Sequence, residues 1–265
     1  ANVPVYSYGA MLGLGLVIGS YLAQREGKRK GLGADFVFEF IVQVSLMFIL
    51  AGRIACVFKV HGWRMVLYPW VLFAGVQLDE GAGALAAGLY TIYFLFRYCD
   101  NGAAFLDALT PPAALMQSLA YLGSSVLGRE TASPWGVRLG ELSLHPLPLY
   151  AALLYYCIFS YLWRMRRSLR FDGQMFLGYL ALSALAQRFL MPFKEVTGES
   201  ALPWLYTLAF VIFGLVWLYL FFQAPLTDVR RRRREVRDWR SWLVYLASLM
   251  GVALLMVKFF YWRFG

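Results

Sequence analysis

Eight long apolar segments follow one another along the chain, and they restrict its fold more than any other feature. A membrane-spanning helix needs about 20 mainly apolar residues, because each residue adds 1.5 Å toward about 30 Å of hydrocarbon. These segments are too long and continuous for the alternating strands of a membrane β-barrel. We therefore predict an all-α, polytopic membrane helical bundle of about eight transmembrane helices, over residues 5–23, 36–58, 79–99, 103–127, 147–163, 173–191, 202–222 and 243–262.

The fourth segment, 103–127, differs from the others because it carries Pro111-Pro112. Proline removes a backbone N–H and clashes with the preceding helical turn. We therefore expect a broken span, or a re-entrant segment followed by a helix.

The basic residues between the segments predict how the chain is oriented, because loops rich in Lys and Arg stay in the cytoplasm. With eight crossings, the odd-numbered loops hold Arg25, Lys28, Arg29, Lys30, Arg97, Arg164, Arg166, Arg167, Arg170, residues 230–234, Arg237 and Arg240. The even-numbered loops hold the smaller set Lys59, Arg64, Arg129, Arg138 and Lys194. We therefore expect the odd loops in the cytoplasm and both termini on the outer side, which also supports a fourth crossing.

The composition excludes several classes of protein. Hydrophobic residues make up 60% of the chain and charged residues 15%, against roughly 45–50% and about 25% in soluble domains. The net charge of +10 does not indicate a nucleic-acid partner, because the basic residues lie between apolar segments and not along one surface. Cys56, Cys99 and Cys157 form neither a disulfide framework nor a metal-ligand set. We predict no metal, no cofactor and no nucleic acid.

A few charged residues lie in or beside the apolar segments and need a reason. A charge inside the bilayer costs at least about 2.5–3.5 kcal/mol. Arg53 and Arg188 fall toward the outer ends of the second and sixth segments, and Glu80 begins the third from the outer side. Two guanidinium groups at one depth can hold a phosphate. A structural Arg–Glu ion pair that ties three helices together explains the same residues equally well.

His145 lies in a polar loop directly before Pro146. A histidine there can act as a general base, but no nucleophile accompanies it in the sequence. We favour the interpretation that it belongs to the beginning of the next helix.

Six short motifs resemble, in order, those of the phosphatidylglycerol–prolipoprotein diacylglyceryl transferases, over roughly residues 5–222. They are Tyr6-Ser7-Tyr8-Gly9, Leu50-Ala51-Gly52-Arg53-Ile54, Asp107 to Pro111, Gly128-Arg129 with Pro134-Trp135-Gly136-Val137, His145-Pro146 with Leu149-Tyr150, and Arg188-Phe189-Leu190. The resemblance implies a multi-pass protein of the bacterial inner membrane, on a seven-helix plan. That family moves a diacylglyceryl group from phosphatidylglycerol to the lipobox cysteine of a lipoprotein precursor and releases glycerol phosphate. Matched motif residues imply that Tyr8, Arg53, Arg129 and Arg188 bind lipid phosphate.

Other positions of the family's motifs are replaced. The His of His-Gly-Gly falls on Glu80, and the Arg and Asn of Gly-Arg-x-Gly-Asn fall on Gln117 and Ala120. Further polar positions fall on Pro148, Ala151 and Pro192. If the family roles carry over, losing a phosphate-facing Arg and several polar partners removes several kcal/mol of transition-state stabilisation.

These departures favour a catalytically degenerate homologue that serves as a lipid-binding or scaffold subunit, with the helix 243–262 docking on other membrane-protein subunits. The alternative is an active, divergent transferase in which Glu80 is the base and Arg53 and Arg188 hold the phosphate of phosphatidylglycerol. A transporter is disfavoured, because no internal repeat pairs two broken helices. We predict a transferase-like membrane domain over 1–222, a basic cytoplasmic linker over 223–240 and an additional transmembrane helix in 241–265.

Overall fold

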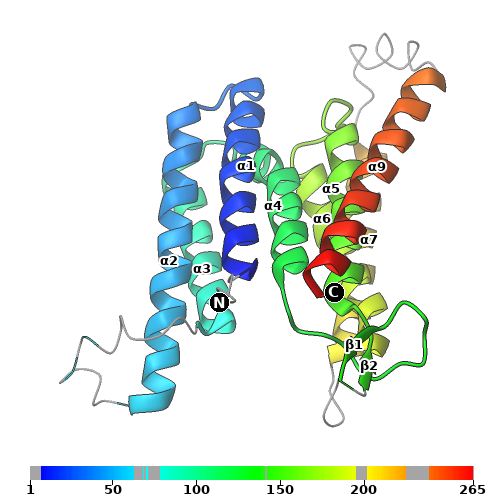
Figure 1. The fold of residues 1–265 in the computed structure, drawn as a ribbon. Coiled ribbons are helices and arrows are strands. Elements are labelled where there is room, and N and C mark those ends of the chain that lie inside the picture. Colours follow the sequence, from blue (N-terminus) through cyan, green and yellow to red (C-terminus); the bar gives the residue numbers. More distant parts are fainter. Residues whose placement is uncertain are drawn as a thin grey trace. The chain divides into compact units, whose positions relative to one another are not determined.

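A computed structural model describes residues 7–62, 68, 70, 78–140, 142–194, 202–224 and 239–264. The chain divides into two compact units. Unit 1 comprises Ala1–Leu22 and Leu106–Gly265, and unit 2 comprises Ala23–Phe105. Both units are built from helices (Figure 1). The basic run 230–234 and the side chain of Glu80 lie outside the described part of the chain.

The described helices are α1 Ser7–Arg29, α2 Ala34–His61, α3 Glu80–Tyr98, α4 Gly102–Gly123, α5 Leu147–Met165, α6 Gln174–Leu190, α7 Leu202–Gln223 and α9 Trp239–Phe264, with the 3-10 turn η3 Met191–Phe193. Two short strands, β1 Val137–Leu139 and β2 Leu142–Leu144, form an antiparallel hairpin between α4 and α5. Each of these helices corresponds to one predicted apolar segment, which confirms an all-α polytopic membrane fold. Within the described residues, four helices qualify as membrane spans by length and composition alone: Ala34–His61, Gln174–Phe193, Pro203–Gln223 and Trp242–Phe264.

The segment with two prolines is one continuous helix, so the expected break at Pro111-Pro112 was wrong. α4 runs over 22 residues, about 33 Å at 1.5 Å per residue, which is enough to cross the hydrocarbon. Both prolines are buried. Gly15 and Gly19 of α1 leave space for Met116 and Pro112 of α4. Proline is tolerated within a membrane helix when neighbouring helices pack around the interrupted turn.

Asp107, near the beginning of α4, ties this helix to α6. Its carboxylate accepts the backbone N–H groups of Gly173, Met175 and Phe176 at 2.9–3.0 Å, and its exposed fraction is 0%. The first N–H groups of a helix have no acceptor within the helix, and a negative charge suits that end of the helix dipole. Gly173 has a φ of +89° at this point, which glycine adopts without strain. Asp107 therefore caps α6 and has a structural role.

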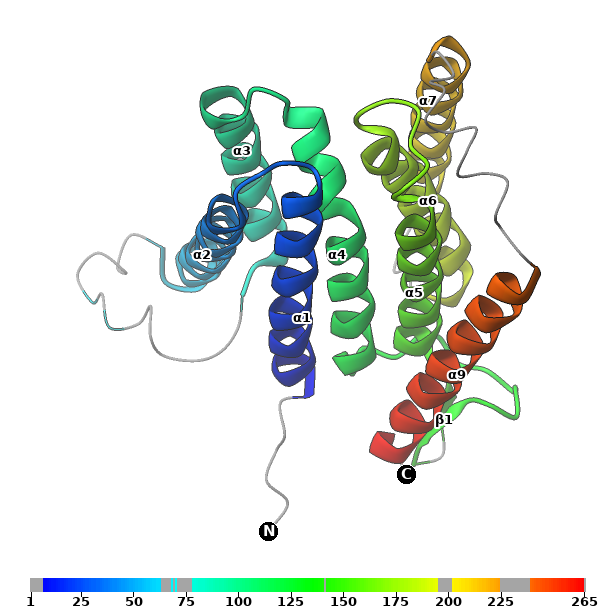
Figure 2. The ribbon, with the colours of Figure 1, turned by 90° about the horizontal axis from the view of Figure 1, so that it is seen from above.

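In unit 1, α4 lies between the first part of α1 and α5 (Figures 1 and 2). The hydroxyl of Ser118 in α4 donates to the carbonyl of Ala152 in α5 at 2.7 Å. The middle of α4 therefore lies inside the bundle, with the glycines of α1 against one side and the hydrogen bond to α5 on the other. The polar side chains of α4 are therefore surrounded by neighbouring helices.

α9 is packed into unit 1 along one face. Met256 and Phe260 are buried in a cluster with Leu122 and Tyr156. Near the other end of α9, the guanidinium of Arg164 lies 3.7 Å from the ring centroid of Trp242. The opposite face of α9 exposes Val244, Met250, Leu254 and Leu255. α9 thus contributes to the core of unit 1 and also presents an apolar surface outward. The predicted segment boundaries 1–222, 223–240 and 241–265 stay a prediction.

In unit 2, α2 and α3 pack closely because glycines face the neighbouring backbone. A side chain at Gly83 would meet the carbonyl oxygen of Phe48 at 2.7 Å, and one at Gly52 would meet that of Asp79 at 2.9 Å. Small residues allow this approach in membrane helices. The rings of Phe36, Phe40, Phe94 and Phe105 fill the other end, with centroids 4.8–5.7 Å apart. The glycine-rich start of α3 therefore serves helix packing.

We expect Asp107→Ala to lower the free energy of unfolding by about 3–5 kcal/mol, because it leaves three N–H groups at the start of α6 without their acceptor. Asp107→Asn keeps one acceptor oxygen and should lose less. Reversible unfolding in mixed detergent micelles measures both. Equal stability of Asp107→Ala and the unchanged chain would contradict the capping role.

Candidate functional site

A group of hydrogen-bonded tyrosines and glutamines, half-buried apart from the buried Tyr155, links α4, α5 and α6 of unit 1. Its first part joins α4 to α6, because the hydroxyl of Tyr179 donates to Oε1 of Gln117 at 2.5 Å. The motif resemblance implies that Gln117 falls on the Arg of the Gly-Arg-x-Gly-Asn motif. The side chain at this position is therefore neutral and already has a hydrogen-bond partner from the neighbouring helix.

The second part of the group is centred on Gln187 in α6. Its amide nitrogen donates to the hydroxyls of Tyr121 in α4 and Tyr155 in α5, each at 3.0 Å. Its amide oxygen accepts a hydrogen bond from Nζ of Lys194 at 2.9 Å. The rings of Tyr121 and Tyr155 stack with their centroids 5.4 Å apart. Gln187 thus links three helices and the residue that follows η3.

Together these residues, Gln117, Tyr121, Tyr155, Tyr179, Gln187 and Lys194, form the Tyr/Gln network. Buried polar groups are stable when their hydrogen-bonding capacity is used. Lys194, beyond the end of the α6 span, is the one charged member. Partial burial lowers the pKa of Lys194 below its ordinary value of 10.5, because desolvation disfavours the charged form. The network can orient neutral groups but offers little positive charge in the interior.

Arg188 follows Gln187 directly, but its side chain is exposed. Consecutive residues of a helix point about 100° apart, so Gln187 faces the network while Arg188 faces outward. Within the described part of the chain, the guanidinium of Arg188 makes no hydrogen bond or ion pair with another residue. The structure therefore leaves the guanidinium of Arg188 outside the network of unit 1.

Arg129 lies in the α4–α5 loop, which we define as residues 124–146. Its backbone N–H donates to the carbonyl of Phe193 at 3.0 Å, and its own carbonyl accepts the N–H of His145 at 3.0 Å. The side chain of Arg129 is exposed and makes a long contact of 3.4 Å to the carbonyl of Pro192. The loop thus brings Arg129 to η3, directly before Lys194.

His145 is held just before α5. Its Nδ1 lies 3.4 Å from the hydroxyl of Tyr150, and its ring packs edge-on against Phe193 with centroids 5.1 Å apart. Gly128 donates its N–H to the carbonyl of His145 at 2.9 Å. These contacts support the interpretation that His145 organises the beginning of the helix.

Tyr8 lies in the first turn of α1, with 42% of its side chain exposed. Its neighbour Ser7 donates its hydroxyl to the carbonyl of Gly123 at 3.0 Å. A side chain at Gly123 would collide with the backbone of Ser7 and Tyr8. The first turn of α1 therefore lies against the end of α4, in the same unit as Arg129 and Arg188.

Arg53 and Glu80 belong to unit 2. The N–H of Asp79 donates to the carbonyl of Gly52 at 3.0 Å, so one hydrogen bond joins the residues that directly precede Glu80 and Arg53. The carboxylate of Asp79 caps α3 by accepting the N–H of Ala82 at 2.9 Å, and it also pairs with Lys59. This geometry brings the backbones of Arg53 and Glu80 together at the start of α3. The expectation that Arg53 and Arg188 share a phosphate stays a prediction.

The Tyr/Gln network was not predicted from the sequence. One signal was present, since Gln117 and Tyr121 are spaced i, i+4 and share a helix face. The other members lie elsewhere: Tyr155 in α5, Tyr179 and Gln187 in α6, and Lys194 after η3. Only the packing of these elements brings them together. Within the described residues, no group of three or more His, Cys, Asp or Glu side chains has the arrangement of a metal site.

Sequence comparison agrees with this architecture. The sequence model of the prolipoprotein diacylglyceryl transferase family matches residues 1–220. A phosphatidylglycerol–prolipoprotein diacylglyceryl transferase of Clostridioides difficile (strain 630) is 21% identical over 203 residues, which cover 71% of this chain and 78% of the relative. One of Tolumonas auensis is 26% identical over 239 residues, covering 82% and 92%. One of Campylobacter jejuni subsp. jejuni is 28% identical over 212 residues, covering 72% and 77%.

The fold defines a polytopic helical membrane protein whose unit 1 encloses a polar interior. The family match extends over most of the chain. The chain belongs to the prolipoprotein diacylglyceryl transferase family, which confirms the resemblance found in its motifs. α9 begins at Trp239, beyond the matched residues.

The lowered pKa of Lys194 predicts a pH dependence of stability. The unfolded chain holds this proton more tightly than the folded chain, so the free energy of unfolding should rise as pH increases through the lowered pKa toward 10.5. Lys194→Met should remove that rise. Thermal unfolding in detergent between about pH 8 and pH 11 compares the two chains. Identical pH slopes would contradict the burial of Lys194.

Proposed function

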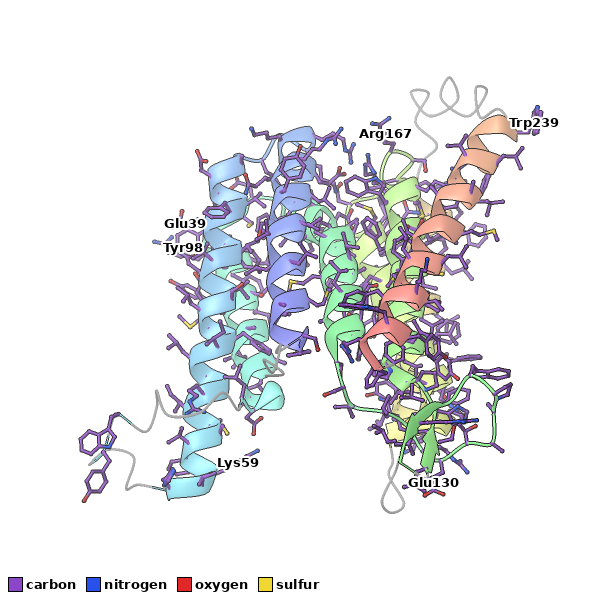
Figure 3. All side chains as sticks on the ribbon, viewed as in Figure 1. Glu39, Lys59, Tyr98, Glu130, Arg167 and Trp239 are labelled. Atoms are coloured by element: carbon purple, nitrogen blue, oxygen red, sulfur yellow. The ribbon has the colours of Figure 1, made fainter. Side chains whose placement is uncertain are left out.

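We propose that this chain is a catalytically degenerate member of its family, which binds phospholipid and acts as a lipid-binding or scaffold subunit of a complex in the bacterial inner membrane. We include in the proposal that both termini face the periplasm. The distribution of basic residues supports this orientation: Arg167 and Trp239 lie at one end of unit 1 and Glu130 at the other (Figure 3).

The chemistry of the family explains why the interior matters. The cysteine thiolate of the precursor attacks a glyceryl carbon, so a sulfur–carbon bond forms. The carbon–oxygen bond to phosphate breaks, and glycerol phosphate leaves with the electron pair. Negative charge therefore moves from sulfur to the departing phosphate during the step. Cationic groups that are held in place before the reaction stabilise this charge most effectively.

The observation that carries the proposal is the side chain at position 117. Gln117 is neutral, and Tyr179 already donates to its oxygen. Loss of one donor that stabilises such a transition state typically slows an enzyme about 10²–10³-fold. Gln187 is hydrogen-bonded to Tyr121 and Tyr155. This network favours a stable resting fold over transfer of a diacylglyceryl group.

Three basic residues support a lipid-binding role. The backbone of Arg129 is bonded to Phe193, directly before Lys194, and Arg188 lies in the last turn of α6, directly before η3. Within the described part of the chain, none of the three has an acidic partner. Basic residues are disfavoured on the outer side of an inner membrane, so a cluster there suits a phosphate-bearing anion. We infer that a phospholipid headgroup, with phosphatidylglycerol as the first candidate, provides it, and that Tyr8 and Arg53 contribute to lipid binding.

Partner subunits are the second part of the proposal. The outward face of α9, with Val244, Met250, Leu254 and Leu255, is apolar and exposed. Such a face packs equally well against lipid or against a helix of another subunit. We propose that a helix of another subunit packs against this face of α9.

An active, divergent transferase is the second candidate function. The hydrogen bond between Asp79 and Gly52 favours it, because it brings the backbones of Arg53 and Glu80 together. In this case Glu80 is the base, and Arg53 and Arg188 hold the phosphate.

A transfer assay separates the two candidates. The purified chain, a lipobox-containing precursor and phosphatidylglycerol vesicles should give product at least about 100-fold more slowly than the Tolumonas auensis relative under the same conditions. The chain should also fail to rescue a transferase-depleted strain. Robust transfer that Glu80→Gln or Arg188→Gln abolishes would contradict degeneracy and support the divergent enzyme.

A lipid-preference measurement tests the proposed binding role. In nanodiscs that contain both phosphatidylglycerol and phosphatidylcholine, native mass spectrometry should detect preferential retention of the anionic lipid. Arg129→Gln and Arg188→Gln should each lower that preference about fivefold, since each cation contributes about 1 kcal/mol. Arg167→Gln, at the opposite end of unit 1, is the charge-matched control. An equal loss of lipid preference in all three variants would exclude a specific lipid-binding cluster near η3.

A further inference from the structure

The last turn of α9 is bonded to three separate segments of unit 1. The hydroxyl of Tyr261 donates to the carbonyl of Trp135 at 2.6 Å. The guanidinium of Arg263 donates to the carbonyl of Leu122 at 3.0 Å and to the hydroxyl of Ser7 at 3.1 Å. It also donates to the carbonyl of Ser124. One helical turn therefore holds the beginning of α1, the end of α4 and the α4–α5 loop.

The bond from Tyr261 continues through the loop as far as Arg129. Nε1 of Trp135 donates to the hydroxyl of Tyr150 at 2.9 Å, and this hydroxyl lies 3.4 Å from Nδ1 of His145. The N–H of His145 donates to the carbonyl of Arg129. A continuous series of contacts thus connects α9 with Arg129, although within the described residues no hydrogen bond or ion pair joins α9 to Arg129 directly.

The loop has little regular structure of its own to hold it. Its strands β1 and β2 are three residues each, and an isolated two-stranded hairpin is marginally stable in water. Val137, the buried residue of β1, belongs to the same cluster as Met256 and Phe260 of α9. α9 therefore adds both apolar and polar contacts to the hydrogen bonds that the loop makes within itself and to η3.

We propose that the last turn of α9 is the positioning element of the α4–α5 loop, with Tyr261 and Arg263 as its positioning residues. The loop keeps the arrangement that holds Arg129 at η3 only while α9 is docked. This role is distinct from docking of α9 on another subunit, since it uses the inward face of the helix. Its consequence for lipid binding rests on the proposed function of Arg129, whereas its effect on the loop does not.

Amide hydrogen exchange of the full chain in phosphatidylglycerol-containing nanodiscs tests the proposal. Tyr261→Phe, which removes a single oxygen atom, should raise exchange in residues 124–146 about fivefold. Arg263→Gln should raise it about tenfold or more. Tyr245→Phe removes a hydroxyl and Lys258→Gln removes a positive charge elsewhere on α9, and both variants should leave the loop unchanged. The N–H groups that Asp107 caps report whether each variant remains folded.

Unchanged loop exchange in both Tyr261→Phe and Arg263→Gln would overturn the proposal. So would equal increases in the two control variants. Tyr261→Phe should also lower the preference for anionic lipid without changing the charge of the chain. Faster loop exchange, together with no lipid preference in the unchanged chain, would support the positioning role and contradict the proposed lipid function.

Discussion

A polar side chain inside a membrane helical bundle is stable only when its hydrogen-bonding groups are matched. Unit 1 satisfies this constraint in two ways. Asp107 uses its charge to cap the first N–H groups of α6. Gln117 and Gln187 are matched by tyrosine hydroxyls of neighbouring helices. The arrangement of α4, α5 and α6 follows from these bonds as much as from apolar packing.

The same constraint links stability to the loss of catalytic equipment. An arginine in the place of Gln117 would bring a charge into the bundle and would need an anion beside it. A neutral glutamine needs no such anion, and its amide oxygen already accepts a hydrogen bond from the hydroxyl of Tyr179. A neutral side chain at this position has no preorganised charge to offer a departing phosphate. The replaced motif positions therefore explain the proposed loss of transferase activity.

Much of the fold was predictable, because length and hydropathy define membrane helices almost independently of their neighbours. The eight segments and the family followed from local patterns. The break at Pro111-Pro112 was wrongly expected, since burial against Gly15 and Gly19 allows the helix to continue. The partners of Gln187 were not predictable, because they come from α4, α5 and the residue after η3. The role of α9 in holding Trp135 depends in the same way on a contact between residues 126 positions apart.

The most direct test of the account is an experimental structure of the chain in phosphatidylglycerol nanodiscs, at a resolution that separates side-chain amides from lipid phosphate. The account predicts that Tyr179 remains bonded to Gln117 and that Gln187 remains bonded to Tyr121 and Tyr155. It also predicts lipid phosphate beside the basic residues near η3. A phosphate bonded to Gln117 in the interior, with the Tyr/Gln network opened around it, would contradict the account.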